Sequence, residues 1–384
     1  QKRHSLPTAH RKEHKAHGEA EAQTLKRVFI SDCEGPISKN DNAFETTSHF
    51  VPHGNKLFAV ISRYDDVLAD VLKRPNYKAG CTLKLILPFL KAYDVTDNKM
   101  REFSAQSLVL ISNIKDTLRH VRSVAYAFII STSYEHYIRA LCQALDFPYE
   151  NTYCTRVSID RYHMTREEKT KLKEIAKEIS QMPIIEIPSN AKSIKDFSEK
   201  DQEIIRRLDE IFWKEIACTD CGRIFSEVNP LGGSEKAESI KDIVQKASVA
   251  LADVMYVGDS ITDVEAFRLV RENGGLTVSF NGNQYAIKNA EIAVLSENSI
   301  VTAMIADVFS RFGKRQALSL VGNWNHEALK KSPADQALLN SLFKLYPREL
   351  PKVKIITSEN MEILARESGE FRKKVRGATI GRLG

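Results

Sequence analysis

The feature that most restricts the fold of this chain is a series of short apolar runs separated by segments with helical periodicity. Most of these runs are apolar at every position rather than at alternate positions, as in parallel strands that are covered on both faces. The pattern predicts an α/β fold with a doubly wound, Rossmann-like parallel sheet. The predicted strands are Val28–Ser31, Ala125–Ser131, Thr152–Ile159, Val254–Gly258, Leu276–Phe280 and Ile292–Leu295.

Two long segments interrupt this alternation, and both are predicted to be mainly helical. One of the helices expected in the second segment begins at Thr165 with Glu168 three positions later, which is the pattern of a capping box. Insertions of this kind would form a cap and a second insert beside the core. The predicted division is a disordered basic tail at 1–26, a core at 27–45, 115–159 and 231–312, a helical cap at 46–114, a second helical insert at 160–230, and a C-terminal extension at 313–384.

Composition indicates a globular protein with an ordinary balance of 42% hydrophobic and 28% charged residues. No stretch offers the roughly 20 apolar residues that span a bilayer, and no apolar signal core is visible, so we expect a cytoplasmic protein. The net charge is +6, and residues 1–27 contribute most of it, with seven Lys and Arg against three Glu. We expect a solvated extension there rather than a nucleic-acid-binding region.

The six cysteines are scattered, and we expect them to be reduced thiols. Cys218 and Cys221 have the spacing of a zinc or redox pair. A structural zinc site needs about four ligands, and no second pair of this spacing exists in the chain. The sequence therefore favours two half-buried thiols at these positions.

Two acids and a turn follow the first predicted strand. Asp32 and Glu34 are two positions apart, so both face one side if strand geometry persists, while Cys33 points into the core. Gly35 permits a sharp turn and Pro36 stiffens its exit. Ligands of open α/β sheets bind beyond the carboxyl ends of the strands, so we expect both carboxylates in one cleft.

Hydroxyl groups and a lysine are expected at the same edge of the sheet. Ser131 and Thr132 come just before a predicted helix, where hydroxyls and N–H groups suit an anion such as phosphate, although plain helix capping explains them equally. Lys236 follows two glycines at the opening of another predicted helix. A lysine there is able to reach a phosphate in the cleft, but lysines on helix surfaces are common.

Two further acids, Asp259 and Asp263, follow the fourth predicted strand in the stretch GDSITD. Four carboxylates at one edge would repel one another unless a hard cation joined them, and Mg²⁺ prefers oxygen ligands. An aspartate beside a lysine and Mg²⁺ is a nucleophile suited to phosphoryl transfer through an aspartyl-phosphate.

In this order the motifs resemble those of the haloacid dehalogenase superfamily, a large group of aspartate-nucleophile phosphatases. They are an apolar run ending in D-x-E-G, a run ending in S-T-S, then G-G-x-x-K, then a run ending in G-D-S-x-x-D, within residues 27–45, 120–160 and 232–300. The resemblance implies these roles: Asp32 as nucleophile and metal ligand, Glu34 as general acid and base with its carbonyl toward the metal, Ser131 as a phosphoryl contact, Lys236 as the neutralising lysine, and Asp259 and Asp263 as metal ligands, the latter directly or through water.

Glu34 stands where this superfamily usually has aspartate, so its longer side chain must fold back to protonate a leaving oxygen. The enolase-phosphatases of methionine salvage also begin with D-x-E-G. A closer similarity is to a mainly archaeal branch that includes energy-converting hydrogenase A subunit R, a name that implies a gene neighbourhood rather than an activity. It is carried by FISDCEGPISKNDNAFE, FIISTSYEHYI, VGDSITD, SFNGNQYA and VGNW.

The expected function is Mg²⁺-dependent hydrolysis of a small phosphorylated metabolite, with the cap selecting the substrate and closing over it. Two alternatives stay open: a phosphotransferase or mutase with the same aspartyl-phosphate, and a non-catalytic hydrogenase-associated subunit that keeps the fold. The expected partner is the small substrate, without membrane or nucleic acid; a homodimer or an accessory protein complex is also left open.

Overall fold

The computed structural model describes residues 27–383, in which seven strands form one sheet. Their order is β3-β2-β1-β4-β5-β6-β7, with β7 antiparallel and all other neighbours parallel. The predicted α/β fold with a parallel sheet is therefore confirmed. The strands are β1 (Val28–Ser31), β2 (Tyr126–Tyr134), β3 (Thr152–Thr155), β4 (Val254–Gly258), β5 (Leu276–Phe280), β6 (Ile292–Leu295) and β7 (Lys352–Ile355).

Helices cover both faces of the sheet, which explains the continuous apolar runs. In β1, Val28 and Ile30 belong to the apolar cluster on one face and Phe29 to the cluster on the other. The first face carries α11 (Ser234–Ala247), α12 (Val264–Glu272), α13 (Gln284–Asn289) and α18 (Met361–Arg376). The second carries α6 (Ile114–Val124), α7 (Glu135–Leu145), α14 (Ile300–Phe312), α15 (Lys314–Gly322), α16 (His326–Lys330) and α17 (Gln336–Leu345).

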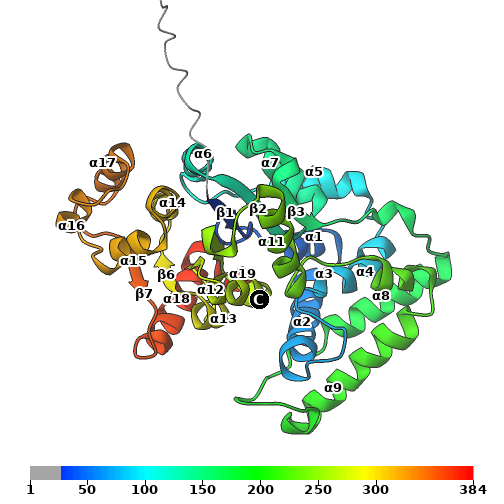
Figure 1. Ribbon diagram of the computed structural model, residues 1–384. Coiled ribbons are helices and arrows are strands. Elements are labelled where there is room, and N and C mark those ends of the chain that lie inside the picture. Colours follow the sequence, from blue (N-terminus) through cyan, green and yellow to red (C-terminus); the bar gives the residue numbers. More distant parts are fainter. Residues whose placement is uncertain (1–26, 384) are drawn as a thin grey trace, which may run out of the picture.

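The two helical insertions pack together beside the sheet and share one apolar cluster, which we call the cap cluster (Figure 1). Leu57 from the first insertion and Ile175 and Leu208 from the second belong to it. The predicted capping box of Thr165 and Glu168 is present at the start of α8. The helices are α1 (Asn42–Phe50), α2 (Gly54–Asp66), α3 (Thr82–Leu85), α4 (Leu87–Ala92), α5 (Asp97–Ser107), α8 (Arg166–Ser180), α9 (Glu199–Glu210) and α10 (Ile224–Glu227).

Some element boundaries differ from the prediction. β2 continues to Tyr134, so the following helix begins at Glu135 and not at Ser133. β3 ends at Thr155, because Val157 and Ile159 leave the sheet and pack in the cap cluster. The C-terminal extension, expected to be a mixed tail, contributes β7 and α18 and ends in the short helix α19 (Ala378–Gly381).

Three further predictions concern the N-terminal tail, the cysteines and membrane-spanning segments. The expected tail at 1–26 lies outside the described residues. All six cysteines are free thiols; Cys221 is buried and Cys218 is exposed. Within residues 27–383, no helix has both the length and the apolar character needed to cross a bilayer.

Candidate active site

The carboxyl ends of β1, β2 and β4 meet at the centre of the sheet, where β1 lies between the other two strands. Asp32 immediately follows β1, and its backbone N–H donates to the carbonyl of Val257 in β4, at 2.8 Å. Asp259 immediately follows β4, and Ser131 lies near the end of β2. Side chains that are more than 200 residues apart in the chain thus meet at one edge, as the strand pattern predicts.

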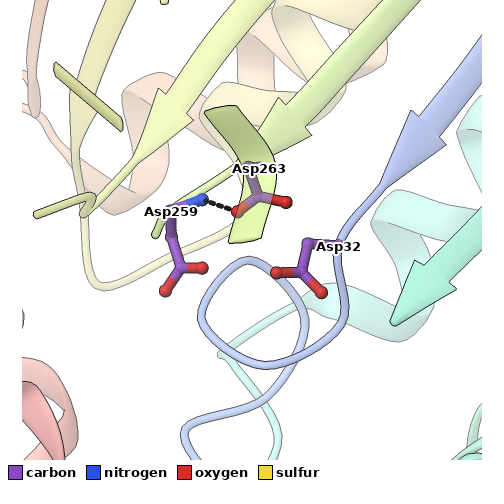
Figure 2. Close-up of side chains that lie close together, drawn as sticks. All are labelled: Asp32, Asp259 and Asp263. Carbon is purple, nitrogen blue, oxygen red and sulfur yellow. Dashed lines mark hydrogen bonds between the residues drawn. The ribbon is translucent and has the colours of Figure 1, made fainter. Parts of the chain in front are cut away.

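Three carboxylates form a buried cluster at this edge (Figure 2). Asp32, Asp259 and Asp263 each place one oxygen within 4.8 Å of the others. Among residues 27–383, this is the one group of three or more potential metal-ligating side chains. Oxygen ligands of this kind are those that Mg²⁺ prefers, so the cluster fits a hard divalent cation.

Lys236, in α11, forms ion pairs with two of the three carboxylates. Its ammonium nitrogen lies 3.0 Å from Oδ2 of Asp32 and 2.8 Å from Oδ1 of Asp263, and its side chain is fully buried. Burial alone would lower the pKa of Lys236, but the charges of Asp263 and Asp32 outweigh it and raise that pKa, so the lysine is charged. Burial raises the pKa of Asp32, and Lys236 opposes that shift.

Asp263 is the most heavily hydrogen-bonded member of the cluster. Its Oδ1 accepts from Lys236 and from the hydroxyl of Tyr256, at 2.6 Å, and its Oδ2 accepts from the N–H groups of Asp259 and Ser260. Burial raises the pKa of Asp263, but Lys236 and these donors lower it below its usual value. The Asp263 carboxylate therefore has two roles: it holds the loop after β4 in place, and it contributes negative charge to the site.

The carboxylate of Glu34 faces a different part of the site from the cluster. Its Oε1 accepts from the N–H of Asn42 at 2.7 Å, at the start of α1, where Asp41 is the N-cap. Burial and then the neighbouring charge of Asp41 raise the pKa of Glu34 well above its usual value. Three of the four predicted acids thus converge closely, while the side chain of Glu34 lines the same cavity from the turn after β1.

Gly35 allows that turn to pass close to the carboxylate cluster. Its φ angle is +109°, and a Cβ at this position would lie 2.1 Å from Oδ2 of Asp259. Both the backbone conformation and the lack of space exclude a side chain. Cys33, one position before Glu34, is fully buried in the core as predicted.

Ser131 and Thr132 line the cavity from the end of β2. The hydroxyl of Ser131 accepts from the N–H of Ser133 at 3.1 Å, whereas the hydroxyl of Thr132 donates to the carbonyl of Leu231 at 2.9 Å. Ser131 therefore keeps its own hydroxyl proton for a ligand, while Thr132 also helps to hold the chain that leads into α11.

The cavity is small, at about 110 Å³, and it is lined by residues that follow β1 and β4, by the end of β2, by α2 and by α18. Asp65 and Asp66 reach it from α2, and Arg372 and Arg376 reach it from α18. None of the four was predicted from the sequence, because neither helix carries a recognisable phosphoryl-transfer motif. Residues 371–384 are rich in Lys and Arg, but this composition gives no indication of where the two arginines lie.

The comparison with protein families decides which class of proteins this architecture represents. A model described as haloacid dehalogenase-like hydrolase matches residues 112–307, which is half of the chain. The chain belongs to this family. The matched span contains Ser131, Lys236, Asp259 and Asp263, whereas Asp32 and Glu34 of the hydrolase precede it.

A solved structure with the same overall fold covers almost all of this chain. The structure of gene product AF1437 from Archaeoglobus fulgidus superposes with a TM-score of 0.76 at 24% identity, covering 94% of this chain and 99% of the other. A structure of phosphoserine phosphatase in apo form gives a TM-score of only 0.40 at 14% identity, covering 71% of this chain and 95% of the other. The comparison with curated proteins gave no match.

Proposed function

We propose that this hydrolase is a Mg²⁺-dependent phosphomonoesterase that acts on a small phosphorylated metabolite through an aspartyl-phosphate on Asp32. The observation that carries the proposal is the buried Lys236 between Asp32 and Asp263, next to Asp259, at the end of the central strand. A cationic group beside an aspartate and a metal-type oxygen cluster provides what phosphoryl transfer requires, which is charge neutralisation and positioning.

The cluster indicates how a metal would be held. Asp32 and Asp259 would hold Mg²⁺, and Asp263, whose two oxygens already accept four hydrogen bonds, would act through water. When bound, Mg²⁺ would offset the negative charge of the phosphoryl oxygens and of the carboxylates. Ser131, Thr132 and Lys236 would contact the phosphoryl oxygens: the first two line the cavity, and Lys236 lies beside Asp32.

The proposed reaction has two steps, transfer of the phosphoryl group to Asp32 and hydrolysis of the resulting aspartyl-phosphate. A carboxylate oxygen of Asp32 forms a bond to phosphorus, the ester P–O bond breaks, and the leaving oxygen takes a proton from the Glu34 carboxyl. A water molecule then attacks the phosphorus of the aspartyl-phosphate and gives its proton to the Glu34 carboxylate, which releases phosphate and restores Asp32. The raised pKa of Glu34 supports the first role, because a protonated carboxyl is needed as the acid.

The small cavity and the cap favour a small metabolite. The cavity volume is only about 110 Å³, which favours a compact group such as a phosphoryl group beside the carboxylates. The remaining part of a substrate would meet Asp65 and Asp66 of α2 and the end of α18. These cap and C-terminal residues would therefore determine which leaving group is accepted.

The test is phosphate release from a broad panel of phosphate esters with Mg²⁺, repeated with EDTA and with Asp32→Asn. We expect wild-type turnover that EDTA abolishes and that Asp32→Asn lowers by at least about 10³-fold, as for loss of a nucleophile. Equal inactivity of both proteins over the panel would reject the proposal in favour of a non-catalytic, hydrogenase-associated role. Phosphorylated products appearing with added alcohols or sugars would favour a phosphotransferase.

A further inference from the structure

The last long helix reaches into the carboxylate cluster. Arg372 and Arg376 are four positions apart and lie on one face of α18. Nη1 of Arg372 donates to Oδ2 of Asp259, and Nη1 of Arg376 lies 3.2 Å from the same oxygen. The two arginine side chains are each 4% exposed, so both ion pairs are shielded from water. Oδ2 of Asp259, a potential metal ligand, thus already contacts two guanidinium groups.

The two guanidinium groups differ in how firmly they are held. Arg376 also donates to the carbonyls of Lys39 and Asn40, so it fixes the chain before α1. Arg372 has a weaker set of contacts, to the carbonyl of Asp259 and to that of Leu383 at 3.3 Å. Its Nε is buried without any hydrogen-bond partner. Apart from Asp259, Arg372 is therefore the less firmly anchored of the two side chains.

The charges in direct contact with the cluster are balanced without a metal ion. Lys236 pairs with both Asp32 and Asp263, and Arg372 and Arg376 both pair with Asp259, so three cations match three carboxylates in number. Counted over these six groups alone, a divalent cation added to this arrangement would leave two positive charges in excess in a buried site. Glu34 and Asp41 also line the cavity, and burial raises the pKa of both carboxyl groups. The excess disappears when the arginines move away from Asp259 or when a phosphoryl dianion enters.

The same segment contacts the cap. Ile380 and Leu383, which follow α18, pack against the cap cluster, and Leu383 also lines the cavity. The end of the chain described by the structure therefore touches Asp259 through Arg372 and the cap through these apolar side chains. α18 and the residues after it therefore connect Asp259 physically with the cap cluster.

We propose that Arg372 and Arg376 are an internal counter-ion that occupies Asp259 until a divalent cation replaces it, which couples metal binding to release of α18 and α19 from the site. This inference rests on the proposed function only in taking Asp32, Asp259 and Asp263 as the metal site. The free protein holds its site closed and neutral, and metal binds weakly until an anionic substrate compensates for its charge.

The first test measures Mn²⁺ binding to the full chain without substrate, by calorimetry and by the electron paramagnetic resonance signal of free Mn²⁺. We expect Arg372→Gln to bind Mn²⁺ about tenfold more tightly than wild type, within the range of coupled sites. The matched control is Arg366→Gln, the same change at an exposed position of α18, which leaves the affinity unchanged. Equal or weaker binding by Arg372→Gln overturns the proposal, since weaker binding would make Arg372 a group that holds Asp259 in place for the metal.

The second test uses the wild-type protein and does not depend on the folding of a variant. Amide hydrogen exchange of peptides covering Met361–Gly381 is compared with and without saturating Mn²⁺. Faster exchange with the metal is expected, and unchanged or slower exchange contradicts release of the helix. If neither wild type nor Arg372→Gln binds Mn²⁺, the metal site itself fails; if both bind equally, only the counter-ion role fails.

Discussion

Lys236 shows, at the scale of a single residue, how a buried charge can be both a structural and a chemical requirement. It has no exposed surface and contacts two carboxylates that are otherwise enclosed by protein. Buried ions are tolerated only when they are paired, because transfer from water costs several kcal/mol per charge. Removal of the lysine therefore affects the free energy of unfolding as well as the chemistry.

We predict that Lys236→Met lowers the free energy of unfolding at pH 7 by about 3–5 kcal/mol, since it leaves Asp32 and Asp263 without their counter-ion. Urea unfolding of the variant and wild type measures this difference. Because the two acids are able to take up protons instead, the difference should shrink at pH 5. Lys241→Met, at an exposed position of the same helix, should change the unfolding free energy by less than about 0.5 kcal/mol.

The proposed role of Glu34 as the general acid can be tested separately from any role in substrate binding. We predict that Glu34→Gln lowers kcat by about 10²–10⁴-fold for an alkyl phosphate, because the leaving oxygen loses its proton donor. For p-nitrophenyl phosphate, whose leaving group needs no proton, the loss should be much smaller. Equal losses for the two esters would assign Glu34 to structure, through its hydrogen bond with the N–H of Asn42.

Gly35 adopts a backbone conformation that favours glycine, and it lies directly against Asp259 of the carboxylate cluster. We predict that Gly35→Ala destabilises the protein by about 1–3 kcal/mol, because its φ of +109° is unfavourable for alanine and its Cβ would overlap Oδ2 of Asp259. Circular dichroism during thermal unfolding measures the loss. Gly369→Ala in α18, where no atom lies within 4 Å of the added Cβ, is the control and should be neutral or stabilising. Equal stability of wild type and Gly35→Ala would show that the turn is able to rearrange.

At the scale of the elements, α2 presents Asp66 to the cavity without an ion pair within residues 27–383, and the charge of Arg63 only partly offsets its surroundings. Burial, with the charges of Asp65 and Asp70, raises the pKa of Asp66 to about 8. The folded protein thus binds this proton more tightly than the unfolded chain does. Stability associated with the neutral acid is fully present below about pH 4 and is lost as the pH rises toward 8.

We predict that Asp66→Asn removes this loss. Its Tm relative to wild type should rise between pH 5 and pH 8.5 by about 2–4 °C for each kcal/mol involved. Thermal unfolding at both pH values provides the measurement, and Asp116→Asn on the exposed face of α6 is the control. A Tm difference that does not depend on pH would mean that Asp66 is ionised in the folded protein at pH 5.

The elements also show what could be predicted from the sequence. Four of the predicted strands have the observed limits, because each is a run of apolar residues between turns. β7 was missed, since in the run KVKI only Val353 is buried and four residues are too few to reveal alternation. Lys236 and the three clustered aspartates followed from motifs at strand ends. Arg372 and Arg376 did not, because their function depends on where α18 packs, which no local pattern records.

At the scale of the whole molecule, a bound ion should stabilise the fold by mass action. We predict that Mg²⁺ at 100 times its dissociation constant raises the free energy of unfolding by about 2.7 kcal/mol, and that EDTA reverses the effect. Differential scanning calorimetry measures it, with Asp259→Asn as the variant that should lose most of the response. Stabilisation that survives in Asp259→Asn would place the bound ion elsewhere.

The shared apolar cluster of the two insertions has a consequence for how such a protein can be shortened or recombined. Leu57 belongs to one insertion and Ile175 and Leu208 to the other, yet all three lie in one continuous interior. Removing either insertion would expose the apolar side chains of the other to water, and exposed apolar surface of this kind favours aggregation. We therefore expect that a shortened variant has to lose both segments or neither, although more than 40 residues that include β2 and β3 separate them in the chain.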